Sequence, residues 1–169
     1  MAKGFSHEST ALSVPVEWYT PQYIFDSLGL EFDLDPCAAP AYDNVPAKNK
    51  YVLPTDGLLE KWYGTVWLNP PYGKQTPLWI NKMIHHNDGI ALVFARTDTQ
   101  WFQKAIETAS IVCFIGSRVK FVNGNTGKSD GTPGAGSALI GWGDTAYTAI
   151  SQSGLGKCMV LAPSNCGKC

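Results

Sequence analysis

Residues 66–72 read Val-Trp-Leu-Asn-Pro-Pro-Tyr, an apolar run that ends at a rigid polar turn. Neither Pro70 nor Pro71 has a backbone N–H, so the two prolines cannot continue a central strand. A strand that ends here presents the side-chain oxygen of Asn69 and the carbonyl oxygen of Pro70 as neighbouring acceptors, with the ring of Tyr72 beside them. Two acceptors and a ring suit a planar group that carries an exocyclic amine, such as adenine.

The same tetrapeptide also has a purely structural interpretation. Asn-Pro is a common way to open a turn, and Pro-Pro followed by an aromatic residue occurs in ordinary loops. The hydrophobic strand before the turn and Gly73 after it favour a catalytic site. Its candidate catalytic residues are Asn69, Pro70, Pro71 and Tyr72.

The composition is that of an ordinary globular domain. A chain of 169 residues with 44% hydrophobic and 16% charged residues is long enough for one domain with a real core. The formal net charge of -1 gives no global sign of a nucleic-acid partner, so any DNA contact has to come from a local basic patch. No signal-peptide pattern or bilayer-length apolar stretch is visible, which predicts a cytoplasmic protein without membrane contact.

The five cysteines are an odd number without regular spacing, which argues against a disulfide framework. Cys166 and Cys169 form a Cys-x-x-Cys pair with Cys158 upstream, but zinc usually needs a fourth ligand and none stands at a recognisable spacing. We therefore expect no metal site, and a flexible tail with reduced thiols over residues 163–169.

The pattern of apolar residues predicts alternating helices and strands. A short helix over 21–28 is expected to start with Thr20 as its N-cap and Pro21 as its first residue, and to end at Gly29. Residues 39–50 have loop composition, and residues 123–136 form a long glycine-rich connection. Strands are expected at 30–34, 51–53, 66–68, 90–95, 111–115, 118–122, 137–142 and 157–161, and further helices at 77–86, 98–108 and 145–151.

This alternation predicts an α/β domain with a mostly parallel sheet and helices on both faces. The continuous apolar run at 90–95 is typical of a strand that is covered on both sides. We expect one domain over residues 15–162, after a disordered lead-in over residues 1–14. Ligands of such sheets bind at the carboxyl ends of strands. Asp35-Pro36, Asp56, the Asn69–Tyr72 turn and Arg96 are expected at that edge.

Several segments, taken in order, resemble the small phage-type DNA N6-adenine methyltransferases, the Dam-like family. The resemblance covers roughly residues 15–142. The segments are Trp18-Tyr19-Thr20-Pro21, Phe32-Asp33-Leu34-Asp35-Pro36-Cys37-Ala38, Asp56-Gly57-Leu58, Val66-Trp67-Leu68-Asn69-Pro70-Pro71-Tyr72-Gly73, Arg96-Thr97-Asp98-Thr99-Gln100-Trp101-Phe102 and the stretch 116–121.

The resemblance implies a Rossmann-like, S-adenosylmethionine-dependent methyltransferase fold. It also implies that a phage or prophage protein transfers a methyl group from S-adenosylmethionine to a flipped adenine of double-stranded DNA. Residues 18–20 match the segment that holds the methionine end of the cofactor, residues 35–38 the loop beside it, and Asp56 the acid that contacts its adenine amino group. The implied cofactor-binding residues are Trp18, Tyr19, Thr20, Asp35, Pro36, Cys37, Ala38, Asp56 and Asn69.

The chain departs from the family pattern in three respects. The usual glycine-rich pattern after the first strand is replaced by Asp35-Pro36-Cys37-Ala38-Ala39-Pro40. The acid that grips the cofactor ribose is not identifiable, and Asp43 is a weak candidate. No separate target-recognition domain is visible.

Contacts to DNA phosphates need basic side chains near the expected edge. Each lysine also has the simpler interpretation of a solvated surface charge. The candidates are Lys74, Arg96, Arg118, Lys120 and Lys128, with Lys82 as a further one. Three alternative amine substrates keep the same fold: cytosine N4, RNA adenine and a protein glutamine. A catalytically silent DNA-binding module is the alternative from a different class.

Overall fold

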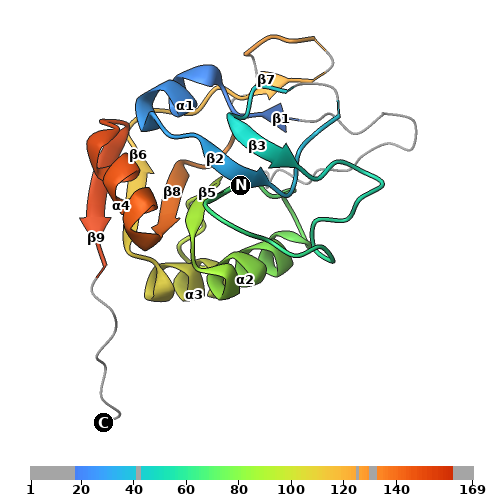
Figure 1. The fold of residues 1–169 in the computed structure, drawn as a ribbon. Coiled ribbons are helices and arrows are strands. Elements are labelled where there is room, and N and C mark those ends of the chain that lie inside the picture. The colour runs from blue at the N-terminus through green and yellow to red at the C-terminus, as the bar shows by residue number, and fades with distance from the viewer. Residues whose placement is uncertain (1–17, 41–42, 125, 130–132, 162–169) are drawn as a thin grey trace, which may run out of the picture.

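The computed structural model describes residues 18–40, 43–124, 126–129 and 133–161. A seven-stranded sheet in the order β3-β2-β4-β5-β8-β6-β9 forms its centre, and β1 and β7 form a second, two-stranded sheet (Figure 1). The strands are β1 (Trp18–Tyr19), β2 (Phe32–Asp35), β3 (Ala47–Lys50), β4 (Val66–Leu68), β5 (Gly89–Phe94), β6 (Ile111–Ile115), β7 (Val122–Asn123), β8 (Ser137–Trp142) and β9 (Gly156–Val160). The helices are α1 (Gln22–Leu28), α2 (Thr76–His86), α3 (Gln100–Thr108) and α4 (Gly143–Gln152).

The α/β class is confirmed, but the large sheet is mixed. β2 pairs in parallel with β3 and β4, and β4 pairs in parallel with β5. β8 is antiparallel to both β5 and β6, and β9 is antiparallel to β6. The expectation of a mostly parallel sheet therefore holds for β3-β2-β4-β5 and fails beyond β5. No helix separates β6 from β8 in the described residues, so nothing there provides the crossover that a parallel connection needs.

Helices cover both faces of the sheet, as the sequence predicts. Helices α2 and α3 pack on one face and contribute Trp79, Ile80, Met83 and Phe102 to a buried cluster (Figure 1). Helices α1 and α4 pack on the other face, where a second cluster contains their buried residues Ile24, Phe25, Leu28, Ala146 and Ile150. The sheet is therefore the middle of three layers. No helix in the described part of the chain is long and apolar enough to cross a membrane.

Most element predictions are confirmed to within a few residues, and those at the N-terminus of α1 and around β3 and β7 are wrong in part. α1 ends at Gly29, which takes the left-handed conformation with φ 57°. Its N-cap is Pro21 and no side chain caps it, so Thr20 is not the cap. The expectations for residues 1–14 and 163–169 lie outside the described residues.

β3 occupies residues that the sequence predicts as loop, while the strand expected at 51–53 is absent. The physical reason is that β3 is an edge strand in which Lys48 and Asn49 are exposed, so its sequence, Ala-Lys-Asn-Lys, lacks apolar alternation. In place of the strand expected at 118–122, the structure has the short strand β7, Val122–Asn123. Val119 and Phe121 are buried against the α1–α4 cluster, which produces the alternation without a paired strand.

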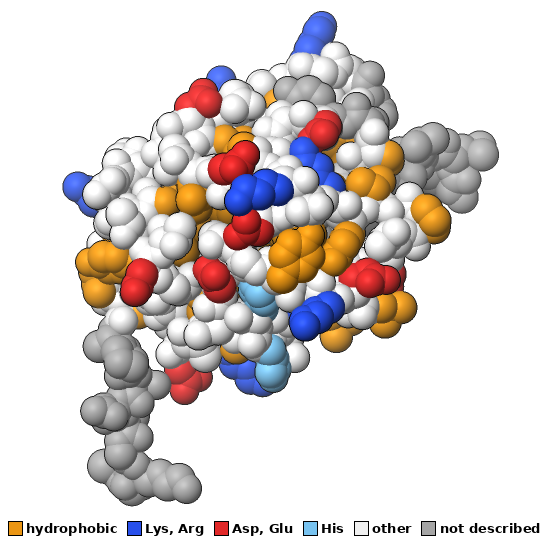
Figure 2. Space-filling model, in the orientation of Figure 1, with side chains coloured by type: hydrophobic (Ala, Val, Ile, Leu, Met, Phe, Trp, Pro, Cys, Tyr) orange, Lys and Arg blue, Asp and Glu red, His pale blue; other side chains and the backbone are white. Residues whose placement is uncertain are grey.

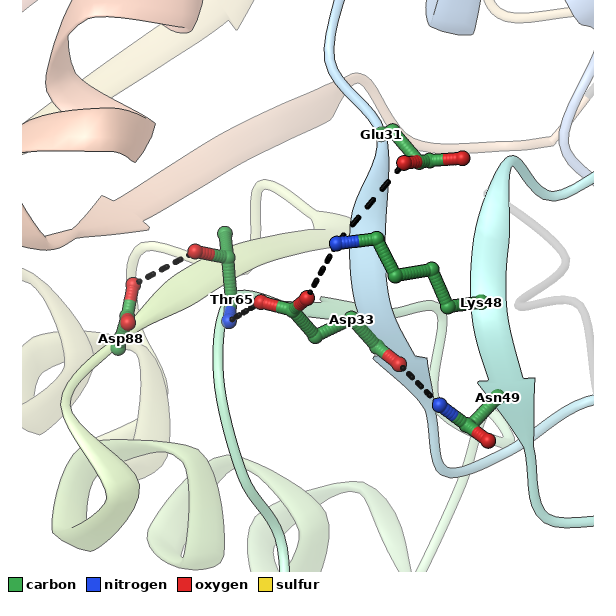
Figure 3. Close-up of polar contacts among 6 residues, drawn as sticks. All are labelled: Glu31, Asp33, Lys48, Asn49, Thr65 and Asp88. Carbon is green, nitrogen blue, oxygen red and sulfur yellow. Dashed lines mark hydrogen bonds and ion pairs between the residues drawn. The ribbon is translucent and has the colours of Figure 1, made fainter.

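A network of polar side chains ties the strands together near their amino ends (Figure 3). Asp33 accepts hydrogen bonds from Lys48 Nζ and from the backbone N–H of Thr65, each at 2.9 Å. Lys48 also lies 3.9 Å from Glu31, and Thr65 Oγ1 donates to Asp88 at 3.3 Å. We call these five residues the amino-edge network. It joins β2 to β3 and to the segments that lead into β4 and β5.

Candidate active site at the carboxyl edge

The Asn-Pro-Pro-Tyr turn lies where the sequence predicts, directly after the buried strand β4. Thr76, the first residue of α2, fastens the turn. Its Oγ1 donates to the Pro71 carbonyl at 2.8 Å and accepts from the backbone N–H of Gly73 at 3.0 Å. Asn69 is half-buried, and its Oδ1 accepts a hydrogen bond of 3.2 Å from the hydroxyl of Tyr72. The expected amine acceptor is therefore occupied by a neighbouring side chain.

Three aromatic rings form the wall next to Asn69. The ring of Tyr72 stacks on Phe94, with centroids 4.0 Å apart and planes 13° from parallel. Phe121 meets both rings edge-on, each at 6.3 Å between centroids. Burial raises the pKa of Tyr72, so its hydroxyl stays a neutral donor. The sequence predicts Tyr72 but not Phe94 or Phe121. Phe94 is the last residue of the buried strand β5, and this position at the carboxyl end of a strand is the sequence signal that could have identified it as a site residue.

Asp35 ends β2 at the same edge of the sheet and is only 3% exposed. Its carboxylate accepts a hydrogen bond of 3.0 Å from the backbone N–H of Cys37. Burial raises the pKa of Asp35 to about 6, and the Cys37 N–H and the charge of Lys50 act in the opposite direction. Lys50, the register partner of Asp35 on β3, is ion-paired with Asp43. That ion pair brings Asp43, the weak candidate for the ribose acid, to the end of β3.

The loop around Asp56 packs against the segment after β2. A Cβ atom on Gly57 would lie 1.9 Å from the carbonyl oxygen of Pro36, so only glycine permits this approach. Asp56 itself is exposed, and its Oδ1 accepts a hydrogen bond of 2.9 Å from the backbone N–H of Leu58. The structure thus brings Asp56 next to residues 35–38, with one carboxylate oxygen engaged in its own turn.

Thr20 and Ser137 are buried hydroxyl residues, each 2% exposed, whose Oγ atoms find no hydrogen-bond partner among the described residues. Thr20 precedes α1, and a short connection joins the C-terminus of α1 to the start of β2. The N-terminus of α1, and with it Thr20, therefore lies near the carboxyl end of β2. Ser137 starts β8 opposite Phe94. An unpaired buried hydroxyl costs about 1–3 kcal/mol, and such groups call for an explanation. Sequence patterns gave no sign of Ser137, because its position depends on long-range pairing.

We use the name rim for five residues at this edge of the sheet, namely Thr20, Asp35, Asn69, Tyr72 and Ser137. Cys37 and Ala38 are half-buried beside it, and Pro36 is buried. Trp18 is 37% exposed and Tyr19 is buried, on the strand that pairs with β7. Two surface hollows lie elsewhere, one between α2 and α3 and the other beside α4 and Val160.

The candidate phosphate contacts divide into two groups. The exposed residues are Lys74, Arg96, Arg118, Lys120 and Lys128, and Arg118 also donates to the Pro133 carbonyl at 3.1 Å. Lys82 differs, because its ammonium donates to the carbonyls of Leu58 and Glu60 and lies 5.2 Å from the centre of the Trp62 ring. Burial lowers its pKa. These contacts hold Lys82 against the loop after Asp56, and its contact with phosphate stays a prediction. Figure 2 shows basic side chains interspersed with acidic ones on the face drawn.

Comparison with known proteins identifies the family. Residues 8–155 match the model of the family described as DNA N-6-adenine-methyltransferase (Dam). The chain belongs to the Dam family. A DNA N-6-adenine-methyltransferase from Escherichia phage T1 is 30% identical over 137 residues, which cover 66% of this chain and 56% of that protein. The chain thus spans little more than half the length of this curated Dam relative. No solved structure matches the chain.

Proposed function

We propose that this Dam-family chain transfers a methyl group from S-adenosylmethionine to N6 of an adenine in double-stranded DNA. The observation that carries the proposal is the half-buried Asn69 oxygen, which stands at the end of a fully buried strand and accepts a hydrogen bond. Family membership and the phage relative support the reaction. With helices on both faces and a parallel half-sheet, we further propose that the fold is Rossmann-like. A DNA substrate of a phage-type enzyme lies in the cytoplasm of a bacterial host.

The residues at the rim fit a cofactor such as S-adenosylmethionine. When bound, it supplies a methyl group on a cationic sulfur that leaves as a neutral thioether. The unpaired hydroxyl of Thr20 offers a hydrogen bond, and the buried carboxylate of Asp35 offers a negative charge to a cation. We assign cofactor binding to residues 18–20, 35–38, Asp56 and Asn69.

Asn69 and Pro70 act on the amine itself. The Asn69 side-chain oxygen and the Pro70 carbonyl accept its two N–H groups, which favours a tetrahedral nitrogen whose lone pair is released from the ring. Both oxygens also stabilise the positive charge that develops on the nitrogen during transfer. This interaction is stronger in the transition state than in the ground state, so it accelerates the reaction.

Tyr72 exchanges partners when a base arrives. An incoming amine competes with the Tyr72 hydroxyl for Asn69 Oδ1, since that oxygen is the hydrogen-bond acceptor of the hydroxyl. Extrusion of a base from a duplex costs a few kcal/mol, and stacking on an aromatic ring returns about 1–3 kcal/mol. Phe94 backs the Tyr72 ring at 4.0 Å and gives the stack a fixed wall. The exposed cations Lys74, Arg96, Arg118, Lys120 and Lys128 contact phosphates and supply most of the affinity.

The test is to incubate the purified chain with methyl-labelled S-adenosylmethionine and one substrate at a time. The substrates are unmethylated double-stranded DNA, RNA and a glutamine-containing protein mixture, each digested and analysed by mass spectrometry. The expected product is N6-methyladenine in DNA alone. Label in N4-methylcytosine, in RNA or in glutamine would redirect the proposal to that amine. Folded protein that labels nothing would reject the enzyme in favour of a silent DNA-binding module.

A further inference from the structure

Two cysteines lie directly opposite each other at the far edge of the sheet from β3. Cys113 on β6 is the register partner of Cys158 on the edge strand β9. Cys113 is fully buried, whereas Cys158 is exposed. The buried Cys113 sulfur therefore lies next to the Cys158 sulfur, which a reagent in solution can reach.

The hydrogen-bond pattern of these two strands defines the kind of pair. The backbone N–H of Leu161 donates to the Ser110 carbonyl, and that of Gly116 to the Leu155 carbonyl, each at 3.0 Å. Both bonds join opposed residues three positions from the cysteines. Because hydrogen-bonded and non-hydrogen-bonded pairs alternate along an antiparallel ladder, the cysteines form a non-hydrogen-bonded pair. Cα atoms in such pairs lie about 4.5 Å apart, within the range of about 4.4–6.8 Å that a disulfide requires.

Both sulfurs lie on the side of the sheet that α4 covers. Cys113 belongs to the buried cluster that contains Ile150 and Ala146 of α4. The thiol of Cys158 lies 3.7 Å from the carbonyl oxygen of Ile150. Burial, together with the neighbouring Cys158 thiol, raises the pKa of Cys113. Because Cys158 is exposed and Cys113 is buried, we expect Cys158 to react with the oxidant first and Cys113 to react second.

We propose that Cys113 and Cys158 form a cross-strand disulfide when the chain meets a small disulfide oxidant such as glutathione disulfide. The Cys158 thiolate attacks one oxidant sulfur, which breaks the oxidant S–S bond and releases one thiol. Cys113 then loses its proton and attacks the Cys158 sulfur, which displaces the second thiol. One S–S bond forms for each one broken, two electrons pass to the oxidant, and two small thiols leave.

The bond would cross-link the edge strand β9 to β6, and the segment between the two cysteines contains β8 and α4. It closes a long loop and so restricts the unfolded chain. Met159 and Val160 are exposed on β9, which within the described part of the chain pairs only with β6. Neither β6 nor β9 carries a rim residue, so oxidation is expected to leave the rim unchanged. This proposal is thus independent of the methyltransfer proposal.

The experiment treats the full chain with glutathione disulfide, blocks free thiols in denaturant and digests the protein without reduction. Mass spectrometry is expected to find the Cys113 peptide joined to the Cys158 peptide, with the loss of two hydrogen atoms in mass. The melting temperature of the oxidised protein should rise by about 5–10 °C and return after reduction. The Cys37→Ser variant serves as the control for thiol specificity and should show the same Cys113–Cys158 cross-link and the same rise in melting temperature as the wild type.

Two variants separate the possible results. Cys158→Ser should lose both the cross-link and the rise in melting temperature, and Cys113→Ala should keep one glutathione on Cys158. If Cys113→Ala does not fold, Cys158→Ser alone decides. Cys158 joined to Cys37, Cys166 or Cys169, or a stable glutathione adduct on wild-type Cys158, would overturn the proposal. So would two free thiols after oxidation.

Discussion

The two ends of β2 carry polar side chains in opposite situations. At the amino edge, Asp33 is bound by Lys48 and by the Thr65 N–H, and these contacts lower its pKa. Two residues later, Asp35 is buried with its pKa raised to about 6. The amino-edge network satisfies its own polar groups and joins strands. The rim holds a buried carboxylate that accepts from the Cys37 N–H and two buried hydroxyls without a partner among the described residues, an arrangement that we interpret as preparation for a ligand.

The largest expected effect is the loss of methyl transfer at the end of β4. Asn69→Ala removes the side-chain acceptor that we propose to hold the amine, and we expect the single-turnover rate to fall by about 10²–10³-fold. Since Asn69 is half-buried and its side-chain oxygen accepts only from Tyr72 among the described residues, the melting temperature should change little. The matched control is Asn49→Ala on the exposed edge strand, which should keep its rate. Equal rates in both variants would remove Asn69 from the mechanism.

A smaller but still large effect is expected from Asp35→Asn on stability. The folded-state pKa of Asp35 is about 6 and the ordinary value is 3.8, so ionisation destabilises the folded state as pH rises through this window. Above about pH 7 the cost is of order 3 kcal/mol, and below about pH 4 it disappears. Asp35→Asn should therefore stabilise the protein at about pH 8 and have little effect at about pH 4. Urea unfolding at both pH values checks this, with exposed Asp98→Asn as control.

Asp33→Asn should act in the opposite direction and more weakly. Asp33 has a lowered pKa because it accepts from Lys48 and from Thr65 N–H, so its stabilising contribution is present above the ordinary pKa and is lost as pH falls below it. Its side chain is 34% exposed, so solvent screens the ion pair. We expect a destabilisation of about 1 kcal/mol at neutral pH, from urea unfolding. A stabilised variant would contradict the role of the amino-edge network.

The smallest expected effect belongs to the hydroxyl of Tyr72. Tyr72→Phe keeps the stack on Phe94 and removes the hydrogen bond to Asn69. Since in the proposed mechanism the amine of the base competes with this hydroxyl, its loss should tighten DNA binding by at most about fivefold, corresponding to about 1 kcal/mol. Titration of a duplex with each variant, followed by anisotropy, measures the change. Weaker binding would indicate that the hydroxyl contacts the DNA.

The sequence predicts best what is encoded locally. β4 and the turn after it, α1 ending at Gly29 and the buried strand β5 follow from short patterns of apolar residues, proline and glycine. β3 was missed because an exposed edge strand does not need apolar alternation. The antiparallel insertion of β8 and the position of Ser137 opposite Phe94 depend on pairing between distant segments, which no local pattern specifies.

The most direct test of the contrast between the two ends of β2 is calorimetric titration of S-adenosylmethionine into Asp35→Asn and Asp33→Asn. The two variants remove one negative charge each, two residues apart on the same strand. We predict that Asp33→Asn binds within about twofold of the wild type at about pH 8, and Asp35→Asn at least about tenfold more weakly. Below about pH 6 the wild type should approach Asp35→Asn, because Asp35 is then protonated. Wild-type affinity in Asp35→Asn, or the loss of binding in a folded Asp33→Asn, would contradict the account.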